Sequence, residues 1–592
     1  MLNKILKETF GYKDFRLSQK EIIDAALSGK DVLGIMPTGG GKSLCYQVPA
    51  LALPGLTIVV SPLISLMQDQ VLTLKDLGVA AEYLNSSLPI AQRRDIEEKL
   101  VNKELKILYV APEGLLNSSF LNTLKNIEVS LVAIDEAHCV SQWGHEFRPQ
   151  YTKLPQLRQH INNCSWMALT ATADKKTQQD ICKQLELKQP KLFVSGFDRP
   201  NIKYMIYDKK NEIKQLDEFI KNNHENQTGI VYCLSRKKVE RITDQLQGLG
   251  YNAVSYHAGL PAKLRAENQH RFTYEENIIV VATIAFGMGI DRPDVRFVAH
   301  LDMPKSIESY YQETGRAGRD GAPADAWMVY GLSDIVRLAS MLEMTEASEA
   351  YKKIARQKLD AMLGLCEALK CRRQVLLEYF NENYPEPCGY CDVCTEPQET
   401  WDATEDVQKL LSTIYRTGQR FGPTHIIDVL RGSRNEKLVN LGHDSLSVHG
   451  IGKEYSKSQW NAILRQVLVK GLIRIKDWEF NILSLTEDCR SVLTGKTKVY
   501  LKPFKKNQKV IKKSKKTFDT DIDQELFEKL RVLRKSIADE YKVPPYIVFN
   551  DKTLQDMCYI KPENKDQMLL VHGVGESKWE KYGELFLKEI HQ

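Results

Sequence analysis

The chain has 592 residues, 43% of them hydrophobic and 27% charged, a composition typical of globular proteins. A chain of this length is too long to fold around one hydrophobic core, and at ~150 residues per domain we expect about four domains. The 82 Lys and Arg residues exceed the 76 Asp and Glu residues by only six, which excludes a uniformly basic surface. Any binding of nucleic acid must therefore use local grooves.

The apolar runs of the sequence are short. Residues 1–15 carry charges throughout and are expected to form a short amphipathic helix, and runs such as 56–60 are far too short to cross a bilayer. We therefore expect neither a signal peptide nor a membrane anchor. Most of the 12 cysteines, such as Cys45, Cys182 and Cys233, have apolar neighbours, as reduced core cysteines do. This predicts an intracellular, reducing compartment.

Aromatic, arginine and glutamine side chains gather near the first long predicted helix, in residues 10–19. The amide of Gln19 carries a paired donor and acceptor that can read the edge of adenine, and Tyr12 or Arg16 can stack on the ring. On these residues alone, an ordinary capped helix is the better interpretation.

A glycine-rich turn, Met-Pro-Thr-Gly-Gly-Gly-Lys-Ser at residues 36–43, follows the apolar run 32–35 and precedes a predicted helix. Consecutive glycines let backbone N–H groups surround a polyphosphate, and a helix N-terminus adds positive charge. Lys42 would reach the β- and γ-phosphates and Ser43 would bind Mg²⁺. The strict motif has glycine where this chain has Met36, so a flexible glycine turn is the alternative. The predicted ATP-binding residues of this turn are Thr38, Gly39, Gly40, Gly41, Lys42 and Ser43.

Apolar runs at 56–61, 107–110, 131–134 and 166–169 alternate with helical stretches, which predicts a parallel, doubly wound sheet. Ligands bind beyond the carboxyl ends of such strands. Asp135 and Glu136 follow one of these runs directly. Asp135 suits a Mg²⁺ contact, and Glu136 can orient and deprotonate the attacking water. Paired surface carboxylates are common, but their position at a buried strand end favours an ATPase site.

The next loop, residues 141–149, combines two aromatic side chains with an arginine. Trp143 and Phe147 can stack on unpaired bases, and Arg148 can bind a phosphate or a ring face. A tryptophan buried in the core is the alternative for Trp143. The small, hydroxyl-bearing residues 168–173 are expected to hydrogen-bond to the acidic motif and couple it to the rest of the domain.

The ordered motifs resemble those of superfamily-two helicases. Asp-Glu-Ala-His at 135–138, followed by Cys-Val-Ser-Gln-Trp-Gly-His-Glu-Phe-Arg-Pro at 139–149, resembles RecQ-family DNA helicases in particular. The resemblance implies that Tyr12, Arg16 and Gln19 read adenine and that the aromatic loop senses single-stranded DNA. The phosphate loop of that family is similar in lacking a glycine at the position of Met36.

A second series of apolar runs, 228–233, 253–256, 278–282 and 295–300, predicts another parallel sheet after a turn-rich boundary at 197–201. This half has no phosphate loop of its own. Arg316 and Arg319 lie among glycines, and an arginine supplied across a cleft accelerates phosphoryl transfer by ~10³ or more. We expect one of them to act as an arginine finger, with Gln312 as a polar sensor. A solvated arginine pair is the alternative.

Residues 282–291 are similar to the fifth motif of the family, which couples nucleotide state to the bound strand. Two halves that close on ATP and open on its release would step along a single strand.

Four cysteines, Cys371, Cys388, Cys391 and Cys394, have the spacing of a metal site. Four thiolates suggest a closed structural zinc site, with an iron–sulfur cluster as the alternative. The resemblance favours Zn²⁺ and suggests that Arg372 and Arg373 contact the DNA backbone.

The C-terminal third is expected to hold accessory modules. Helical spacing at 406–430 and 458–471, followed by a hairpin pattern at 472–476 and 482–485, predicts a winged helix that docks on duplex DNA, with 477–481 as a possible wedge. Residues 496–516 contain ten lysines and no acid, which predicts a flexible, phosphate-attracting linker. Residues 517–592 resemble the HRDC domain (helicase and RNase D C-terminal). Their 15 acidic against 11 basic residues make a protein-contact role as strong an expectation as DNA binding.

The sequence thus predicts an α/β protein with two RecA-like parallel-sheet motor domains, a helical zinc-binding module, a winged-helix domain and a small all-α HRDC domain. The expected boundaries are 1–199, 200–335, 336–397, 398–495, a basic linker at 496–516, and 517–592.

The resemblance implies a bacterial ATP-dependent DNA helicase that moves 3′ to 5′ on single-stranded DNA and unwinds duplexes in recombination, repair and replication-fork processing. Its cofactors would be ATP, Mg²⁺ and Zn²⁺. Expected partners are single-stranded and duplex DNA, and single-strand-binding protein or other repair proteins. We expect a monomer in the cytoplasm, associated with the nucleoid.

Two other functions remain open. One is an RNA-stimulated ATPase or RNA helicase, because single-strand stacking and phosphate contacts are shared by both kinds of nucleic acid. The other is a zinc and winged-helix DNA-binding regulator with an inactive motor, which the intact Lys42, Glu136, Arg316 and Arg319 oppose.

Overall fold

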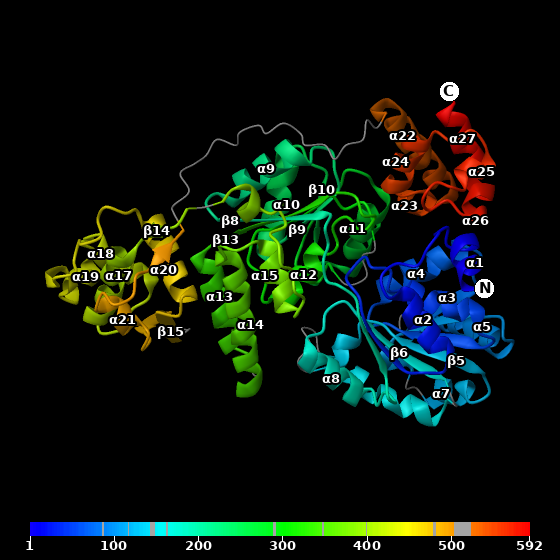
Figure 1. The fold of residues 1–592 in the computed structure, drawn as a ribbon, viewed down its shortest axis with the longest axis horizontal. Coiled ribbons are helices and arrows are strands. Elements are labelled where there is room, and N and C mark those ends of the chain that lie inside the picture. Colours follow the sequence, from blue (N-terminus) through cyan, green and yellow to red (C-terminus); the bar gives the residue numbers. More distant parts are fainter. Residues whose placement is uncertain are drawn as a thin grey trace.

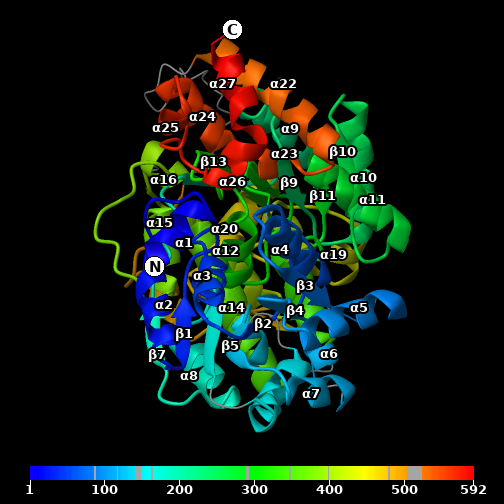
Figure 2. The same cartoon turned by 90° about the vertical axis from the view of Figure 1, so that its right-hand side faces the viewer.

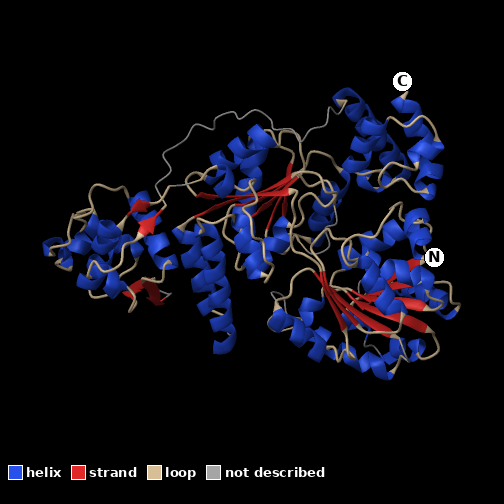
Figure 3. Ribbon diagram, in the orientation of Figure 1, coloured by secondary structure: helices blue, strands red, loops and turns tan. Residues whose placement is uncertain are grey.

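The computed structural model describes residues 1–85, 88–115, 118–141, 148–161, 164–287, 292–345, 348–397, 399–477, 481–502 and 523–591. Within these ranges most strands gather in two large parallel sheets, two small antiparallel pairs lie between residues 401 and 501, and the elements of residues 523–591 are all helices (Figures 1 and 3). No helix among the described residues is long and apolar enough to cross a membrane. The predicted fold class is confirmed.

The first sheet has seven parallel strands in the order β3-β4-β2-β5-β6-β1-β7. The strands are β1 Val32–Ile35, β2 Leu56–Val60, β3 Ala81–Leu84, β4 Ile107–Val110, β5 Val129–Ile134, β6 Ser165–Thr170 and β7 Lys191–Val194. The helices are α1 Leu2–Glu8, α2 Gln19–Leu27, α3 Leu44–Ala52, α4 Ile64–Asp76, α5 Ile90–Val101, α6 Pro112–Leu115, α7 Ser118–Leu124, α8 Lys175–Gln184 and the 3₁₀ helices η1 Ala137–Val140 and η2 Pro149–Gln159.

Both faces of this sheet are covered. Leu33 and Ile35 of β1 belong to one hydrophobic cluster, whereas their neighbour Val32 belongs to a second cluster on the other side. Successive side chains of a strand point to opposite faces, so a strand covered on both sides reads as a continuous apolar run. This explains why β1, β2, β4 and β6 are buried at every position and were visible in the sequence.

The second sheet has six parallel strands in the order β10-β11-β9-β12-β13-β8. The strands are β8 Ile202–Asp208, β9 Gly229–Tyr232, β10 Ala253–Tyr256, β11 Ile279–Ala282, β12 Phe297–His300 and β13 Ala324–Tyr330. The accompanying helices are α9 Glu212–Asn223, α10 Arg236–Gly248, α11 Ala262–Tyr274, α12 Ile307–Thr314 and α13 Leu332–Glu343.

The cysteine module follows the second sheet, with α14 Glu349–Glu367, α15 Arg372–Tyr379 and α16 Asp392–Thr395. Its buried residues, Leu359 and Cys371 among them, join a hydrophobic cluster that also includes strands of both sheets. The module is therefore packed into the motor rather than attached to it by a linker.

A separate hydrophobic cluster organises the next segment, which contains the predicted helices and β-hairpin of a winged helix. Its elements are β14 Trp401–Asp402, α17 Thr404–Arg416, α18 Pro423–Leu430, α19 Glu436–Asn440, η3 His443–Ser445, α20 Lys457–Val469, β15 Ile473–Asp477, β16 Ile482–Leu485, α21 Cys489–Leu493 and β17 Tyr500–Leu501. The hairpin tip at 478–480 and residues 503–522, most of the predicted linker, lie outside the described residues.

The C-terminal helices have their own core. They are α22 Gln524–Tyr541, α23 Pro545–Val548, α24 Asp551–Ile560, α25 Lys565–Met568, α26 Glu576–Lys578, the π-helix η4 Trp579–Gly583 and α27 Glu584–Ile590. Figures 1 and 2 show these helices, in orange and red, beside the blue N-terminal helices of the first sheet.

Candidate nucleotide site and cysteine cluster

The glycine-rich turn joins β1 to α3 and has the conformation that its glycines allow. Gly39 and Gly41 have φ of +78° and +75°, a left-handed region that is costly for residues with a Cβ. Gln19 is 1% exposed and donates from Nε2 to the carbonyls of Gly40 at 3.3 Å and Gly41 at 3.0 Å. In this structure the Gln19 amide thus binds the glycine loop. Recognition of adenine by Gln19 stays a prediction.

Asp135 and Glu136 stand at the carboxyl end of β5, beside the loop. Glu136 has φ of +48°, which a glutamate rarely adopts, and such strain often accompanies functional sites. Its N–H donates to Asp135 Oδ1 at 2.9 Å. This bond fixes the Asp135 carboxylate relative to the backbone of Glu136.

His138 connects this acidic turn to β6. Its Nδ1 lies 2.9 Å from Thr170 Oγ1 and 3.3 Å from Glu136 Oε2, so the expected link between residues 168–173 and the acidic motif is present. Burial, together with the charges of Lys42, Arg148 and Lys358, lowers the pKa of His138 to about 3. The imidazole is therefore neutral at physiological pH.

A cavity of about 380 Å³ brings together residues from three distant parts of the chain. The first motor domain contributes Tyr12, Arg16, Thr38, Gly39, Gly41, Lys42, Ser43, Asp135 and Glu136 to its lining. The second motor domain contributes Gln312, Arg316 and Arg319. The C-terminal helices and their loops contribute Tyr546, Ile547, Asn550, His572 and Lys578. Gln19, Gly40 and Arg148 are absent from the lining described for this cavity.

The segment after α12 packs directly on the glycine loop. A Cβ on Gly315 would lie 2.9 Å from Thr38 Cβ, so only a glycine permits this approach. Gln312 Nε2 also donates to Thr172 Oγ1 of the first domain at 3.3 Å. The residues predicted to act across a cleft, Arg316 and Arg319, are thereby held at the edge of the site.

The contribution of the C-terminal helices was not visible in the sequence. His572 Nε2 lies 2.8 Å from Arg16 Nη2, and its ring centroid is 5.7 Å from that of Tyr12. His572 and Arg16 are 556 residues apart in the sequence, so no local sequence pattern indicates their contact.

The docking of the C-terminal helices involves both motor domains. Lys581 pairs with Asp76 of α4 at 2.7 Å, and Arg531 and Arg534 pair with Glu276 after α11 at 2.8 and 2.7 Å. The C-terminal helices therefore bridge the two sheets at the nucleotide cavity.

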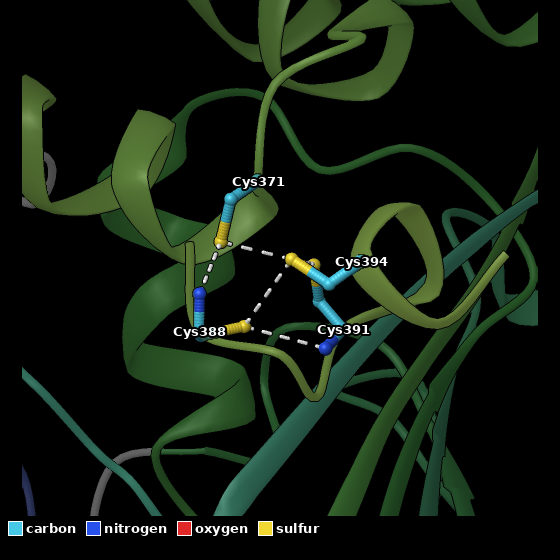
Figure 4. A group of neighbouring side chains, drawn as sticks. All are labelled: Cys371, Cys388, Cys391 and Cys394. Atoms are coloured by element: carbon cyan, nitrogen blue, oxygen red, sulfur yellow. Dashed lines mark hydrogen bonds between the residues drawn. The ribbon is translucent and has the colours of Figure 1, made fainter. Parts of the chain in front are cut away.

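The four predicted metal ligands converge (Figure 4). The sulfur atoms of Cys371, Cys388, Cys391 and Cys394 all lie within 4.8 Å of one another, with separations of 3.5 Å for Cys391–Cys394 and 3.9 Å for Cys371–Cys391 and Cys388–Cys394. A tetrahedral zinc ion with Zn–S bonds of ~2.3 Å would give sulfur separations of ~3.8 Å. The cluster fits one zinc ion, whereas an iron–sulfur cluster needs room for several ions between its thiolates.

Arg372 and Arg373 follow the first cysteine, and both are only 4% exposed. Arg372 forms a two-bond ion pair with Asp392, with both distances 3.0 Å. Arg373 pairs with Asp198 at 3.2 Å. Both guanidinium groups are therefore turned inward onto protein partners, and their contact with the DNA backbone stays a prediction.

Trp143 and Phe147 lie outside the described residues, whereas Arg148 is described. The Arg148 guanidinium donates from Nη1 to the carbonyl of Pro62 at 2.8 Å. Binding of DNA by Arg148 stays a prediction.

Both motor domains and each later module match known families of protein domains. Residues 16–181 match the DEAD/DEAH box helicase model and residues 211–321 match the helicase conserved C-terminal domain, so the two sheets and their shared cavity are a helicase motor that uses ATP. Residues 332–395 match the RecQ zinc-binding model, 397–510 the RQC domain and 523–590 the HRDC domain.

Three curated relatives match this chain over nearly the full length of both proteins. The chain is 46% identical over 591 residues to the ATP-dependent DNA helicase RecQ of Haemophilus influenzae, covering 99% of this chain and 95% of that protein. It is 46% identical over 590 residues to the protein of the same name from Pasteurella multocida, covering 99% and 93%. The corresponding Bacillus subtilis protein is 41% identical over 591 residues, covering 99% and 98%. The chain belongs to the RecQ family of ATP-dependent DNA helicases.

Proposed function

We propose that this protein translocates 3′ to 5′ along single-stranded DNA and unwinds duplex DNA in recombination, repair and replication-fork processing. The observation that carries the proposal is the cavity in which the phosphate loop and acidic turn of one sheet meet Gln312, Arg316 and Arg319 of the other. A motor that closes on a nucleotide needs this two-sided construction.

We assign nucleotide binding to the loop residues Thr38, Gly39, Gly40, Gly41, Lys42 and Ser43, and recognition of the base to Tyr12, Arg16 and Gln19. Lys42 Nζ lies 3.4 Å from the Met36 carbonyl and lines the cavity. The Ser43 hydroxyl and the Asp135 carboxylate also line it and are the hard oxygen ligands that Mg²⁺ prefers. When bound, Mg²⁺ would neutralise charge on the β- and γ-phosphates.

We assign the activation of water to Glu136, because this residue lines the cavity next to Asp135. His138 Nδ1 lies 3.3 Å from Glu136 Oε2, and the neutral imidazole would add no positive charge beside this carboxylate. Arg316 and Arg319 would stabilise the charge that spreads over the γ-phosphoryl oxygens, and Gln312 would link that event to Thr172 of the first domain.

The four cysteines form the zinc-binding site of the RecQ zinc-binding domain. Bound zinc would supply a structural cross-link between α15, α16 and the loop between them. Backbone donors support negative sulfur ligands: the N–H of Cys388 points to Cys371 Sγ at 3.3 Å, and that of Cys391 to Cys388 Sγ at 3.3 Å.

For DNA we propose base stacking on Trp143 and Phe147 and a phosphate or ring contact from Arg148. We also propose the domain division 1–199, 200–335, 336–397, 398–495, 496–516 and 517–592, a monomeric state, and contacts with single-strand-binding or other repair proteins. The DNA helicases among the relatives support a location in the cytoplasm at the nucleoid.

The test is strand separation with ATP and Mg²⁺ on three matched duplexes, with a 3′ DNA tail, a 5′ DNA tail, and RNA in place of DNA. We expect unwinding of the 3′-tailed DNA alone. Glu136→Gln is the matched control, which should bind ATP and unwind nothing. Unwinding of the RNA duplex at a comparable rate would favour the RNA helicase alternative, and ATP hydrolysis without strand separation would refute the helicase proposal.

A further inference from the structure

Arg199 lies on the connection between β7 and β8, where the chain passes from one motor domain to the other. It is 8% exposed, and its guanidinium donates to main-chain carbonyls of four described residues. Nη1 reaches Thr38 of the glycine loop at 2.5 Å and Gly315 at 3.1 Å, and Nη2 reaches Ala317 at 2.8 Å and Gly318 at 3.0 Å. One side chain thus joins the glycine loop to the segment that carries Arg316 and Arg319.

The glycine loop is shaped to receive this side chain. A Cβ on Gly39 would lie 3.2 Å from Arg199 Nη1 and 3.6 Å from Arg319 Cγ. The first distance is tight and the second is ordinary van der Waals contact, so a Cβ at position 39 would displace Arg199 and not Arg319. Because Gly39 has no Cβ, the Arg199 guanidinium can approach the loop backbone closely, as a phosphate could.

The backbone on which Arg199 stands is held from the opposite side by the cysteine module. Arg373 Nη2 donates to the carbonyls of Arg199, Pro200 and Ile202 at 3.2, 3.3 and 2.9 Å. The Phe380 ring stacks on Phe197 with centroids 4.6 Å apart. The fixed connection and the four hydrogen bonds of the guanidinium together give the Arg199 side chain one defined position.

The chemistry of the contact requires arginine. Guanidinium presents five donors in a planar fork and can bind two chain segments at once, whereas the lysine ammonium is a single point. The partners of Arg199 are neutral carbonyls, so the group serves as a bridge rather than as half of an ion pair. Arg199 is also not among the residues that line the nucleotide cavity, which argues for action through the loop rather than on ATP.

We propose that Arg199 is a positioning residue for ATP hydrolysis, which holds Arg316 and Arg319 in register with the phosphate loop. The inference rests on the proposed function of that site. It predicts that loss of the bridge slows the chemical step, because the arginines no longer meet the γ-phosphate correctly, while the loop still binds nucleotide.

The test uses full-length Arg199→Lys, with Asn201→Ala as the matched control. Asn201 belongs to the same connection and donates to Gly318 and Ala322, both at 2.8 Å, but these bonds do not reach the glycine loop. For Arg199→Lys we expect kcat of DNA-stimulated ATP hydrolysis to fall ~10- to 100-fold, the range that a small misplacement of catalytic groups produces. KM for ATP and the Kd for ADP should change less than threefold. Asn201→Ala should keep kcat within threefold of the unmodified protein.

Hydrogen exchange of the nucleotide-free protein gives a readout that does not depend on activity. Arg199→Lys should exchange faster than the unmodified protein at residues 312–319, and at the same rate at 371–394. If the unmodified protein hydrolyses no ATP, the proposed function fails, and the exchange comparison still decides the bridge. Unchanged exchange at 312–319, an unchanged kcat, or an equal loss of kcat in Asn201→Ala would overturn the inference.

Discussion

Substitution of Glu276 would measure how strongly the C-terminal helices are docked on the second motor domain. Its carboxylate accepts from Arg531 Nη2 at 2.8 Å and from Arg534 Nη2 at 2.7 Å, and Arg531 Nη2 also donates to the neighbouring Asn277 Oδ1 at 3.3 Å. Arg534 is 2% exposed and keeps Asp551 as a partner at 2.8 Å. Glu276→Gln removes the charge from the interface and leaves a side chain of nearly the same shape.

The size of the effect follows from these contacts. A hydrogen bond to a charged group contributes about 1.5–3 kcal/mol. Glutamine retains one acceptor, and Glu276 is partly open to solvent, so we expect docking to weaken by about 2 kcal/mol, or roughly 30-fold in the docking equilibrium.

The assay is hydrogen exchange at residues 571–575, which face Gly11 and Tyr12 when docked, because exchange rates report the free energy of local opening. Glu276→Gln should raise these rates roughly 30-fold, the docking change estimated above. The matched control is Glu528→Gln, which removes an exposed partner of Arg531 within α22, at 3.3 Å, without crossing the interface. Equal exchange in all three proteins would refute the reasoning that this ion pair holds the helices on the motor.

Three further predictions concern the motor and the cysteine module. Glu136→Gln should retain ATP binding and lose turnover, measured by equilibrium binding and phosphate release; normal hydrolysis would remove Glu136 from its role. Cys391→Ala should release bound zinc and lower thermal stability, measured by metal analysis and melting; an unchanged zinc content would refute the four-cysteine assignment. The pKa of His138, about 3 against an ordinary 6.5, means that protonation favours the unfolded chain, so its contribution to stability is complete above pH 6.5 and is lost as the pH falls toward 3. Denaturant unfolding should therefore show a loss of about 2 kcal/mol from this group between pH 7.5 and 5, absent in His138→Gln; identical pH dependence in the two proteins would contradict this.

The sequence predicted those features that short stretches encode. Strand β1, the glycine loop and the start of α3 are contiguous, and buried parallel strands are visible as apolar runs. Strands β3, β7, β8 and β13 were not named from the sequence. Strand β7 exposes most of its residues at the sheet edge, and β13 begins with Ala-Asp, so neither reads as a continuous apolar run.

The parts that sequence could not predict depend on surfaces that meet only after folding. The inward orientation of Arg372 follows from Asp392, twenty residues later, and the contact of His572 with Arg16 follows from docking of a separate core. Nothing in the local sequence distinguishes an arginine that binds phosphate from one that binds a buried carboxylate. The same limitation hid the role of Arg199, whose partners come from two other segments.

The cysteine module also has a consequence for synthesis of the chain. Strand β8 is an outer strand of the second sheet, and its Ile206 N–H donates to Asp392 Oδ2, 186 residues later, at 3.3 Å. A ribosome that adds ~5–20 residues per second delivers Asp392 roughly 10–40 s after Ile206. During that interval the outer edge of the nascent second sheet lacks its cover, and exposed strand edges are sites of aberrant pairing. Prompt metal capture by the newly made cysteines would therefore shorten the period in which the half-made motor is open to aggregation.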